Sequence, residues 1–204
     1  MNVAERFGRV SEIDRWVTLR AIEMLAEHRL LGRELCFEIN LSGMTIGDKE
    51  LLELVERRLS ETGVPPHCLI FEVTETSAVA DIARTVDFAE RLAAIGCRFA
   101  LDDFGAGSGS FYHIKQLRFD YLKIDGEFIR ACEGNETDRI LISAIVNIAK
   151  GLGKRTIAEF VENQATVDIL TRLGVDYGQG YFFGRPAPLA DQMGVLPGTL
   201  LSGS

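Results

Sequence analysis

The chain has 204 residues, of which 47% are hydrophobic and 25% charged, and 22 Lys and Arg against 30 Asp and Glu leave a formal net charge of −8. This composition and length are those of an ordinary globular protein with one sizeable core. The acidic balance excludes a long basic face for DNA or RNA and argues against docking on anionic membranes, whereas a small anionic ligand held through metal ions remains compatible with it.

The first half of the chain alternates between helical and strand-like patterns. An opening helix from Ser11 to about Leu31 is predicted from apolar residues at helical spacing, which we expect to be buried: Ile13, Trp16, Val17, Met24, Leu25 and Leu31. Strands are then expected over residues 35–41, 68–73 and 97–102, separated by helices over 48–62 and 81–95. The two helices should end at Gly63 and Gly96, since glycine is the preferred residue after a helix.

The second half continues the alternation after a glycine-rich turn. Strands are expected over residues 119–124, 155–160 and 175–182, with helices over 137–152 and 163–173 between them. Strands that alternate with helices of this length predict an α/β fold built from βα units around a parallel sheet. We find no linker between residues 11 and 188, so the sequence predicts one domain over 1–189 and a peripheral tail over 190–204.

The four cysteines and the N-terminus indicate the compartment. Cys36, Cys68, Cys97 and Cys132 form no Cys-x-x-Cys pair, and the first three open apolar runs, where cysteine usually behaves as a small buried hydrophobe. Residues 1–10 contain no apolar core of a signal peptide, and no window is long and apolar enough for a membrane span. The prediction is a cytoplasmic domain, which a longer, membrane-anchored parent protein could still carry.

Each predicted strand ends in side chains that could bind a metal or a phosphate. They are Asn40, Glu72, Glu75, Asp102, Asp103, Lys123, Asp125, Glu159 and Gln179. In βα barrels the carboxyl ends of the strands carry the active site. We therefore expect these side chains to converge on one rim.

Simpler interpretations remain open for several of these residues. A lone acid at a strand end often caps the next helix. Asp102 and Asp103 fit that less well, because carboxylates about 4 Å apart repel by about 4 kcal/mol at an effective dielectric of 20 and so favour a divalent cation. Oxygen ligands without histidine favour Mg²⁺, Mn²⁺ or Ca²⁺ over zinc. Lys123 would either pair with Asp125, two residues on along the same face, or point at a phosphate or an attacking water.

Three further groups have two interpretations each. The glycine run over residues 105–109 is either a flexible connector or a mobile active-site loop. The three histidines, His28, His67 and His113, lack metal-site spacing and are assigned to surface or packing. Four aromatic residues belong to the core or stack on a base: Phe160, Tyr181, Phe182 and Phe183.

Six segments together carry a family resemblance. They are residues 38–42 (EINLS), 71–75 (FEVTE), 101–105 (LDDFG), 122–125 (LKID), 158–162 (AEFVE) and 179–186 (QGYFFGRP). Taken in this order, they resemble the motifs of the EAL family of cyclic di-GMP phosphodiesterases, from about residue 10 to residue 189. The resemblance implies a modified (β/α)₈ TIM-like barrel of the EAL type.

The resemblance also implies a chemistry, the hydrolysis of cyclic di-GMP to linear pGpG with two Mg²⁺ or Mn²⁺ ions, Ca²⁺ being inhibitory. Asn40, Glu72 and Asp102 would ligate the first ion, and Asp102 with Asp103 the second. Glu159 would bind the second ion or accept a proton from the attacking water. Lys123 and Gln179 would orient that water, and Glu75 would hold the glycine loop. Substrate contacts would come from Asp125, Phe160, Glu162, Tyr181, Arg185 and Pro186.

The chain departs from the family pattern at three places. The Glu-Ala-Leu segment is absent, which predicts a barrel without its first strand or strands and an impaired activity. Phe160 stands where the family has glycine, beside the expected guanine site. Ala106 and Ser108 replace the usual Thr and Tyr in the glycine loop, which bears on regulation through a dimer interface.

Two rival functions stay open beside the phosphodiesterase. One is a catalytically inactive receptor that binds cyclic di-GMP and signals, and the other is an unrelated divalent-metal (β/α)₈ hydrolase. As partners we expect a second copy of the chain and upstream sensory or GGDEF domains in the parent protein, but no nucleic acid polymer and no membrane contact.

Overall fold

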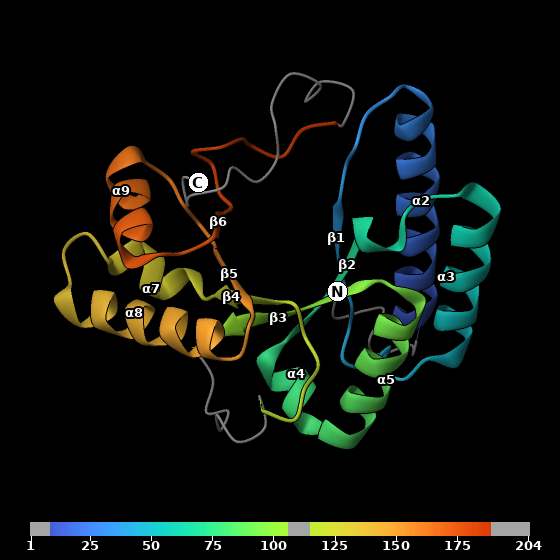
Figure 1. Cartoon of the computed structure of the whole chain (residues 1–204), viewed down its shortest axis with the longest axis horizontal. Helices are drawn as coiled ribbons and strands as arrows, with labels where there is room; N and C mark the ends of the chain where they lie inside the picture. The colour runs from blue at the N-terminus through green and yellow to red at the C-terminus, as the bar shows by residue number, and fades with distance from the viewer. Residues whose placement is uncertain (1–8, 106–114, 189–204) are drawn as a thin grey trace. The chain divides into compact units, whose positions relative to one another are not determined.

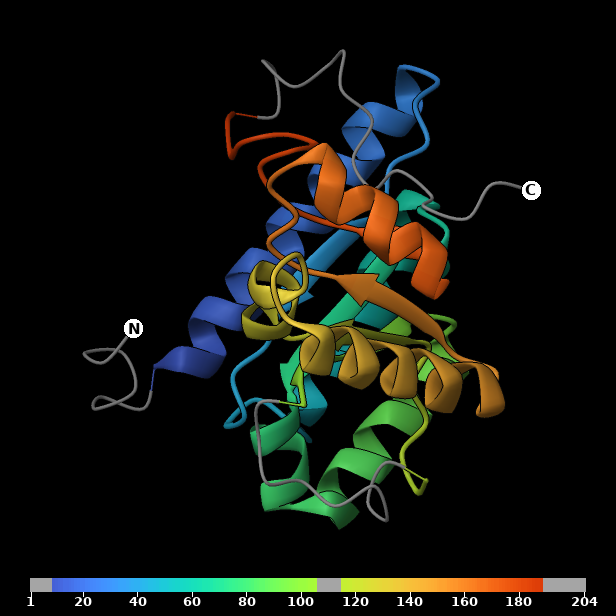
Figure 2. The same ribbon diagram turned by 90° about the vertical axis from the view of Figure 1, so that its left-hand side faces the viewer.

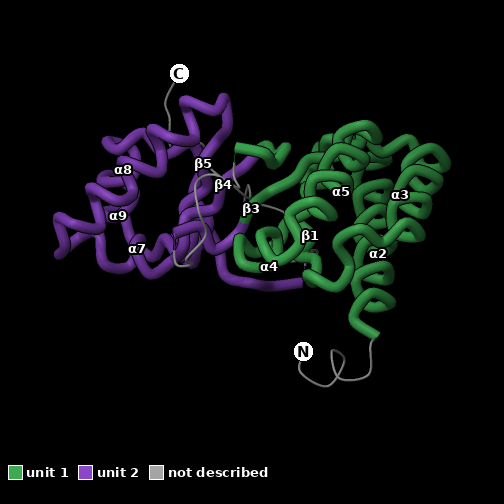
Figure 3. Tube along the Cα trace, turned by 90° about the horizontal axis from the view of Figure 1, so that it is seen from below, with its two compact units in different colours: residues 1–101, 109–120 green, residues 102–108, 121–204 purple. Residues whose placement is uncertain are grey.

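The computed structural model describes residues 9–105 and 115–188. The chain divides into two compact units (Figure 3). Unit 1 comprises residues 1–101 and 109–120, and unit 2 comprises residues 102–108 and 121–204. The division falls within one strand, β3, and each unit is described by itself.

Unit 1 alternates helices and strands in the order expected (Figure 1). Its elements are α2 (Val10–Leu30), β1 (Phe37–Asn40), α3 (Lys49–Thr62), the 3₁₀ turn η1 (Pro66–Cys68), β2 (Leu69–Thr74), α4 (Glu75–Ala80), α5 (Ile82–Ile95) and the first part of β3 (Arg98–Phe104). Strands β1 and β2 are parallel, with Asn40 opposite Glu72. Helices α2 and α3 pack against each other.

Local sequence signals account for the helix ends in unit 1. Asp48 begins α3 by accepting hydrogen bonds from the backbone N–H groups of the first turn, and Asp81 does the same for α5. Gly63 and Gly96 end these helices with left-handed φ values of 66° and 97°. The predicted helices over 48–62 and 81–95 are therefore confirmed to within a residue.

The buried face of α2 differs from the one expected. Of the expected residues, Leu25 is buried, but Ile13, Trp16, Val17 and Leu31 are exposed, Trp16 by 67%. The other buried residues of the helix are Val10, Asp14, Thr18, Ala21 and Ile22. The reason is that two polar residues lie on the buried face and have partners there: Asp14 accepts hydrogen bonds from Ser42 N and Thr45 Oγ1, and Thr18 donates to Asp14 O. A hydrophobicity pattern cannot register such partners. The helix also begins after Arg9 rather than at Ser11.

Unit 2 contains the end of β3 and the remaining elements. They are β4 (Tyr121–Ile124), α7 (Gly126–Ala131), α8 (Glu136–Gly151), β5 (Arg155–Ala158), α9 (Gln164–Leu173) and β6 (Tyr177–Gly178). Strand β5 is parallel to β4 and to β6. Helix α8 packs against α7, α9, β4 and β5, and the three helices can be followed around these strands in Figures 1 and 2. Parallel strands alternating with helices confirm the α/β class.

Several element boundaries differ from the expectation. The short helices α4 and α7 were not predicted, because six residues are too few to show a helical period. The strand expected over 155–160 ends at Ala158, since Phe160 has a φ of 52°, and the strand expected over 175–182 is limited to Tyr177–Gly178. The glycine run beyond Gly105, His113 and the tail from residue 189 lie outside the described residues.

The described thiols are all free, but not all buried. Cys68, Cys97 and Cys132 are buried as small hydrophobes, whereas Cys36 is exposed, contrary to the expectation. Burial raises the pKa of the Cys97 thiol to about 12. Among the described helices, none has the length and apolar character needed to cross a membrane.

Candidate active site

Three carboxylates gather at the strand ends of unit 2. One oxygen each of Asp102, Asp103 and Glu159 lies within 4.8 Å of the others. Asp102 and Asp103 lie at the end of β3, and Glu159 follows β5. Successive side chains of a regular strand point to opposite faces, but Asp103 has a left-handed φ of 54°, which allows both neighbours to reach one cluster. We call these three residues the acid cluster.

A buried lysine neutralises part of the acid cluster. Lys123 on β4 is 2% exposed, and its Nζ lies 2.9 Å from Glu159 Oε1 and 3.3 Å from Asp102 Oδ1. The sequence suggested an ion pair between Lys123 and Asp125, but the structure gives Asp125 another role. Asp125 caps α7 by accepting a hydrogen bond from Glu127 N at 2.6 Å. Lys123 thus pairs with the acid cluster.

The electrostatics of the acid cluster favour a cation. Two carboxylates that lie within 4.8 Å of each other repel by roughly 3 kcal/mol or more at an effective dielectric of 20, so one lysine does not offset three negative charges. The pKa of Asp103 is raised, by burial first and then by the charges of Asp102 and Asp125. Within the described part of the chain, the buried Asp102 Oδ1 accepts no hydrogen bond, although Lys123 Nζ is its ion-pair neighbour. An all-oxygen set with an unsatisfied buried carboxylate oxygen fits a hard divalent cation.

Unit 1 brings together a second pair of predicted ligands. Asn40 and Glu72 are partners in the register of β1 and β2, and Leu41 N donates to Glu72 O at 2.8 Å. In-register residues of parallel strands lie on the same face, so the two side chains share one side of this strand pair. Glu72 and Glu75 are each 3% exposed, and Glu75 is the first residue of α4. These residues belong to unit 1 and the acid cluster belongs to unit 2.

Phe160 follows Glu159 directly and lies against helix α7. Its side chain is 48% exposed, and the Cζ atom of Arg130 lies 3.9 Å from its ring centroid. A Cβ atom built on Gly126 would come within 2.1 Å of Phe160 Cδ2. Sequence reasoning placed Phe160 near the site but missed Arg130 and Gly126, because neither stands at a strand end or in a recognised motif.

The remaining candidate residues of unit 2 lie on its surface. Gln179 follows β6, its backbone N donates to Ala158 O at 2.8 Å, and its O accepts from Val161 N at 3.0 Å. Arg185 Cζ lies 4.9 Å from the Tyr181 ring centroid. The other candidates on this surface are exposed as well: Glu162, Phe182 and Pro186. Exposure of Tyr181 and Phe182 rules out the core interpretation for both.

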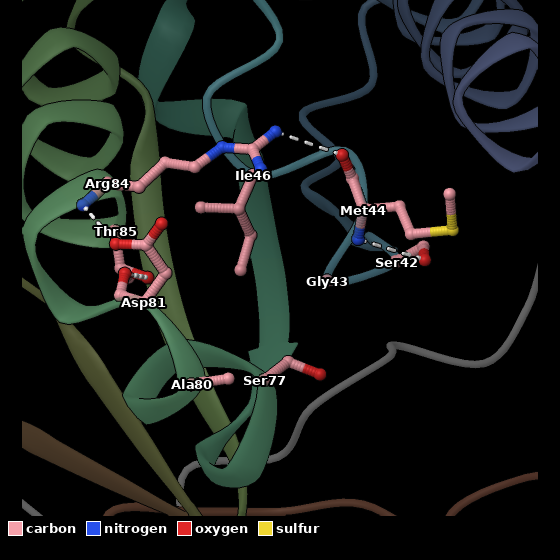
Figure 4. Close-up of a pocket in the computed structure, with 9 residues that line it drawn as sticks. All are labelled: Ser42, Gly43, Met44, Ile46, Ser77, Ala80, Asp81, Arg84 and Thr85. Carbon is pink, nitrogen blue, oxygen red and sulfur yellow. Dashed lines mark hydrogen bonds between the residues drawn. The ribbon is translucent and has the colours of Figure 1, made fainter.

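A pocket in unit 1 contains none of the predicted site residues. It has a volume of about 440 Å³ and lies between the chain after β1 and the helices α4 and α5 (Figure 4). Arg84 Nη2 donates to Met44 O across it at 3.1 Å. This pocket therefore does not coincide with the candidate site.

Relatives with named functions match nearly the whole chain. The chain is 38% identical over 187 residues to cyclic di-GMP phosphodiesterase PdeB of Shewanella oneidensis, and the match covers 92% of this chain and 22% of PdeB. It is 36% identical over 191 residues to cyclic di-GMP phosphodiesterase PdeF of Escherichia coli, and that match covers 94% of this chain and 26% of PdeF. The chain thus spans about a quarter of the length of these relatives.

Solved structures of similar fold are described as a phosphodiesterase and as an EAL domain. The phosphodiesterase PaMucR in complex with c-di-GMP superposes with a TM-score of 0.87 at 33% identity, over 93% of this chain and 77% of that one. The EAL domain of Xanthomonas citri FimX in complex with c-di-GMP gives 0.89 at 28% identity, over 93% and 75%. The family model described as the EAL domain matches residues 1–186. The fold class expected from the six motifs is confirmed, and the chain belongs to the EAL domain family.

Proposed function

We propose that the protein hydrolyses cyclic di-GMP to linear pGpG through a catalytic domain spanning residues 1–189. The observation that carries the proposal is the acid cluster with the buried Lys123 paired to two of its members, Asp102 and Glu159, in a chain of the EAL family. Three carboxylates beside one buried ammonium are costly for a scaffold, because their mutual repulsion is only partly offset.

The acid cluster would hold Mg²⁺ or Mn²⁺. In the proposed arrangement two ions would bind, the first to Asn40, Glu72 and Asp102 and the second to Asp102 and Asp103. Glu159 would bind the second ion or serve as the general base. When bound, the ions would activate water and offset charge on the phosphate. Ca²⁺ would occupy the same oxygen ligands and support binding of the dinucleotide without turnover.

The chain's own residues would move the proton and place the reactants. Glu159 accepts a proton from the attacking water, and its contact with Lys123 Nζ at 2.9 Å fixes the position of the carboxylate. Lys123 also places a positive charge where negative charge grows on the phosphate. Gln179 orders the water, and Glu75 holds the glycine loop.

The substrate would be held mainly through its bases. Phe160 is the candidate for stacking on a guanine, since its ring is half-exposed and lies one residue from Glu159. The further proposed contacts come from Asp125, Glu162, Tyr181, Arg185 and Pro186.

Because the chain spans about a quarter of its relatives, the setting of the whole protein is also a proposal. We infer a homodimer in the cytoplasm of a bacterium, with upstream sensory or GGDEF domains as regulatory partners. A relative in Pseudomonas aeruginosa is named a bifunctional diguanylate cyclase/cyclic di-GMP phosphodiesterase, which supports such an arrangement.

The test compares Glu159→Gln with the wild type in two assays. Loss of the general base should reduce hydrolysis in Mg²⁺ by about 10²–10⁴-fold, while affinity for cyclic di-GMP in Ca²⁺ stays within about tenfold, because base stacking does not depend on that carboxylate. Glu136→Gln, on the exposed start of α8, is the matched control and should change neither quantity. A wild type that binds the dinucleotide tightly but never releases pGpG would make the protein a receptor. Failure to bind cyclic di-GMP at all would refute both functions.

A further inference from the structure

We propose that Arg130 is a positioning residue for substrate recognition, which holds the ring of Phe160 as a platform for one guanine base. The proposal rests on the proposed function, because it concerns the same dinucleotide. It adds a residue from helix α7 that lies outside all six sequence motifs, and it states how that residue acts: through Phe160 and not by touching the substrate.

The geometry of α7 makes the platform. Gly126 and Arg130 stand four residues apart on this helix, so they share one of its faces. The ring of Phe160 lies along that face, with Arg130 Cζ 3.9 Å from its centroid and no room for a Cβ at Gly126. Phe160 contacts the helix in this way and is still 48% exposed, which leaves part of its side chain accessible to a base.

The backbone around Phe160 explains why the ring needs support. Phe160 adopts a φ of 52°, a conformation that is unfavourable for a bulky side chain and persists only when the surroundings hold it. Its neighbours are held: Glu159 by the ion pair with Lys123, and Val161 by the hydrogen bond from its N to Gln179 O at 3.0 Å. The contacts with Arg130 and Gly126 hold the ring against α7 between these fixed neighbours.

The effect should fall on binding rather than on the chemical step. The guanidinium attracts the face of the aromatic ring, and a ring that is already fixed loses less freedom when a base stacks on it. The base remains the same distance from the reacting phosphate before and during the reaction, so this interaction is uniform. Uniform binding lowers KM and leaves kcat unchanged.

A direct contact between Arg130 and a phosphate of the substrate would also weaken binding when lost, and a double-mutant cycle separates the two roles. We would measure Kd in Ca²⁺, and kcat and KM in Mg²⁺, for the wild type, Arg130→Gln, Phe160→Ala and the double variant. Arg130→Gln should raise Kd and KM by about two- to fivefold, and Phe160→Ala by about ten- to a hundredfold, with kcat within twofold in both. In the Phe160→Ala background, Arg130→Gln should have no further effect.

Three further variants complete the test. Arg130→Lys keeps a cation near the ring and should restore most of the affinity. Gly126→Ala should weaken binding in the same way, because its methyl group would displace the ring by overlap at 2.1 Å. Arg172→Gln removes a positive charge from the exposed end of α9 and should leave Kd unchanged. Circular dichroism melting curves check that every variant is folded.

The outcomes distinguish this inference from the function on which it rests. An effect of Arg130→Gln that is equally large with and without Phe160 would show a direct contact with the substrate and overturn the positioning role. An unchanged Kd in Arg130→Gln would also overturn it, while leaving the phosphodiesterase intact. Wild-type protein that fails to bind cyclic di-GMP would overturn the proposed function itself, and the inference with it.

Discussion

Replacing the buried lysine by methionine tests whether the acid cluster depends on it. Lys123 Nζ lies 2.9 Å from Glu159 Oε1 and 3.3 Å from Asp102 Oδ1, which corresponds to gross attractions of about 6 and 5 kcal/mol at an effective dielectric of 20. Burial of the ammonium offsets a large part of this gain, since desolvation costs several kcal/mol. What Lys123→Met leaves behind are buried carboxylates without their cation, and such a loss typically costs about 3–5 kcal/mol.

Urea unfolding in EDTA at neutral pH measures this change. With a slope of about 2 kcal/mol per molar urea, the midpoint of Lys123→Met should fall by about 1.5–2.5 M. Millimolar Mg²⁺ should recover part of the loss, because a bound cation replaces the missing positive charge. The double variant Lys123→Met with Glu159→Gln should be less destabilised than the lysine variant alone, since it leaves one charge fewer uncompensated.

Lys150→Met on the exposed surface of α8 is the matched control, and its free energy of unfolding should stay within about 0.5 kcal/mol of the wild type. The reasoning is wrong if Lys123→Met unfolds at the wild-type midpoint in EDTA, or if Mg²⁺ stabilises the wild type and the variant equally. The first result would mean that the two ion pairs add nothing net to stability. The second would place cation binding away from the acid cluster.

Two further changes have defined outcomes. Cys36 is exposed, whereas Cys68, Cys97 and Cys132 are buried, and burial raises the pKa of Cys68 to about 11 and that of Cys97 to about 12. At pH 8 a thiol reagent should therefore label Cys36 quickly and the three buried thiols only after unfolding. These folded pKa values exceed the ordinary value of 9.0. The stability that the neutral thiols contribute is therefore fully present below pH 9 and is lost as the pH rises toward 12. Urea unfolding should accordingly give a lower free energy of unfolding at pH 10.5 than at pH 8. Asp48→Ala should lower the free energy of unfolding by about 1–2 kcal/mol, since it removes both the N-cap of α3 and the contact with Arg15 Nε at 2.9 Å. Asp48→Asn keeps the cap and should lose about half as much. Equal losses in the two variants would contradict the capping role.

Much of the architecture is encoded in local sequence. The glycines after α3 and α5 and the aspartates before them set helix ends that the structure reproduces, because caps satisfy backbone groups within a few residues. The hydrophobic runs between the helices likewise predict the strands, because such runs are also a pattern among neighbouring residues. The polar residues after these runs, above all Asp102 and Asp103, indicate the edge of the sheet that carries the site.

Other features depend on which residues meet across the fold. The buried face of α2 is decided by Asp14, whose partners Ser42 and Thr45 are about thirty residues away in the chain. The apolar periodicity therefore predicted the buried Leu25 correctly but was wrong for Ile13, Trp16, Val17 and Leu31.

The candidate site shows most clearly which features the local sequence predicts and which depend on contacts across the fold. The sequence alone identified Asp102, Asp103, Lys123 and Glu159 as candidates, because each follows or ends an apolar strand. Only the tertiary structure decided that Lys123 pairs with the acid cluster while Asp125 caps α7, and that Arg130 lies over Phe160. The physical reason is that capping and periodicity are properties of neighbouring residues. An ion pair or a ring contact instead requires two distant segments of the chain to approach within a few ångströms, and that approach is set by strand pairing and backbone conformation.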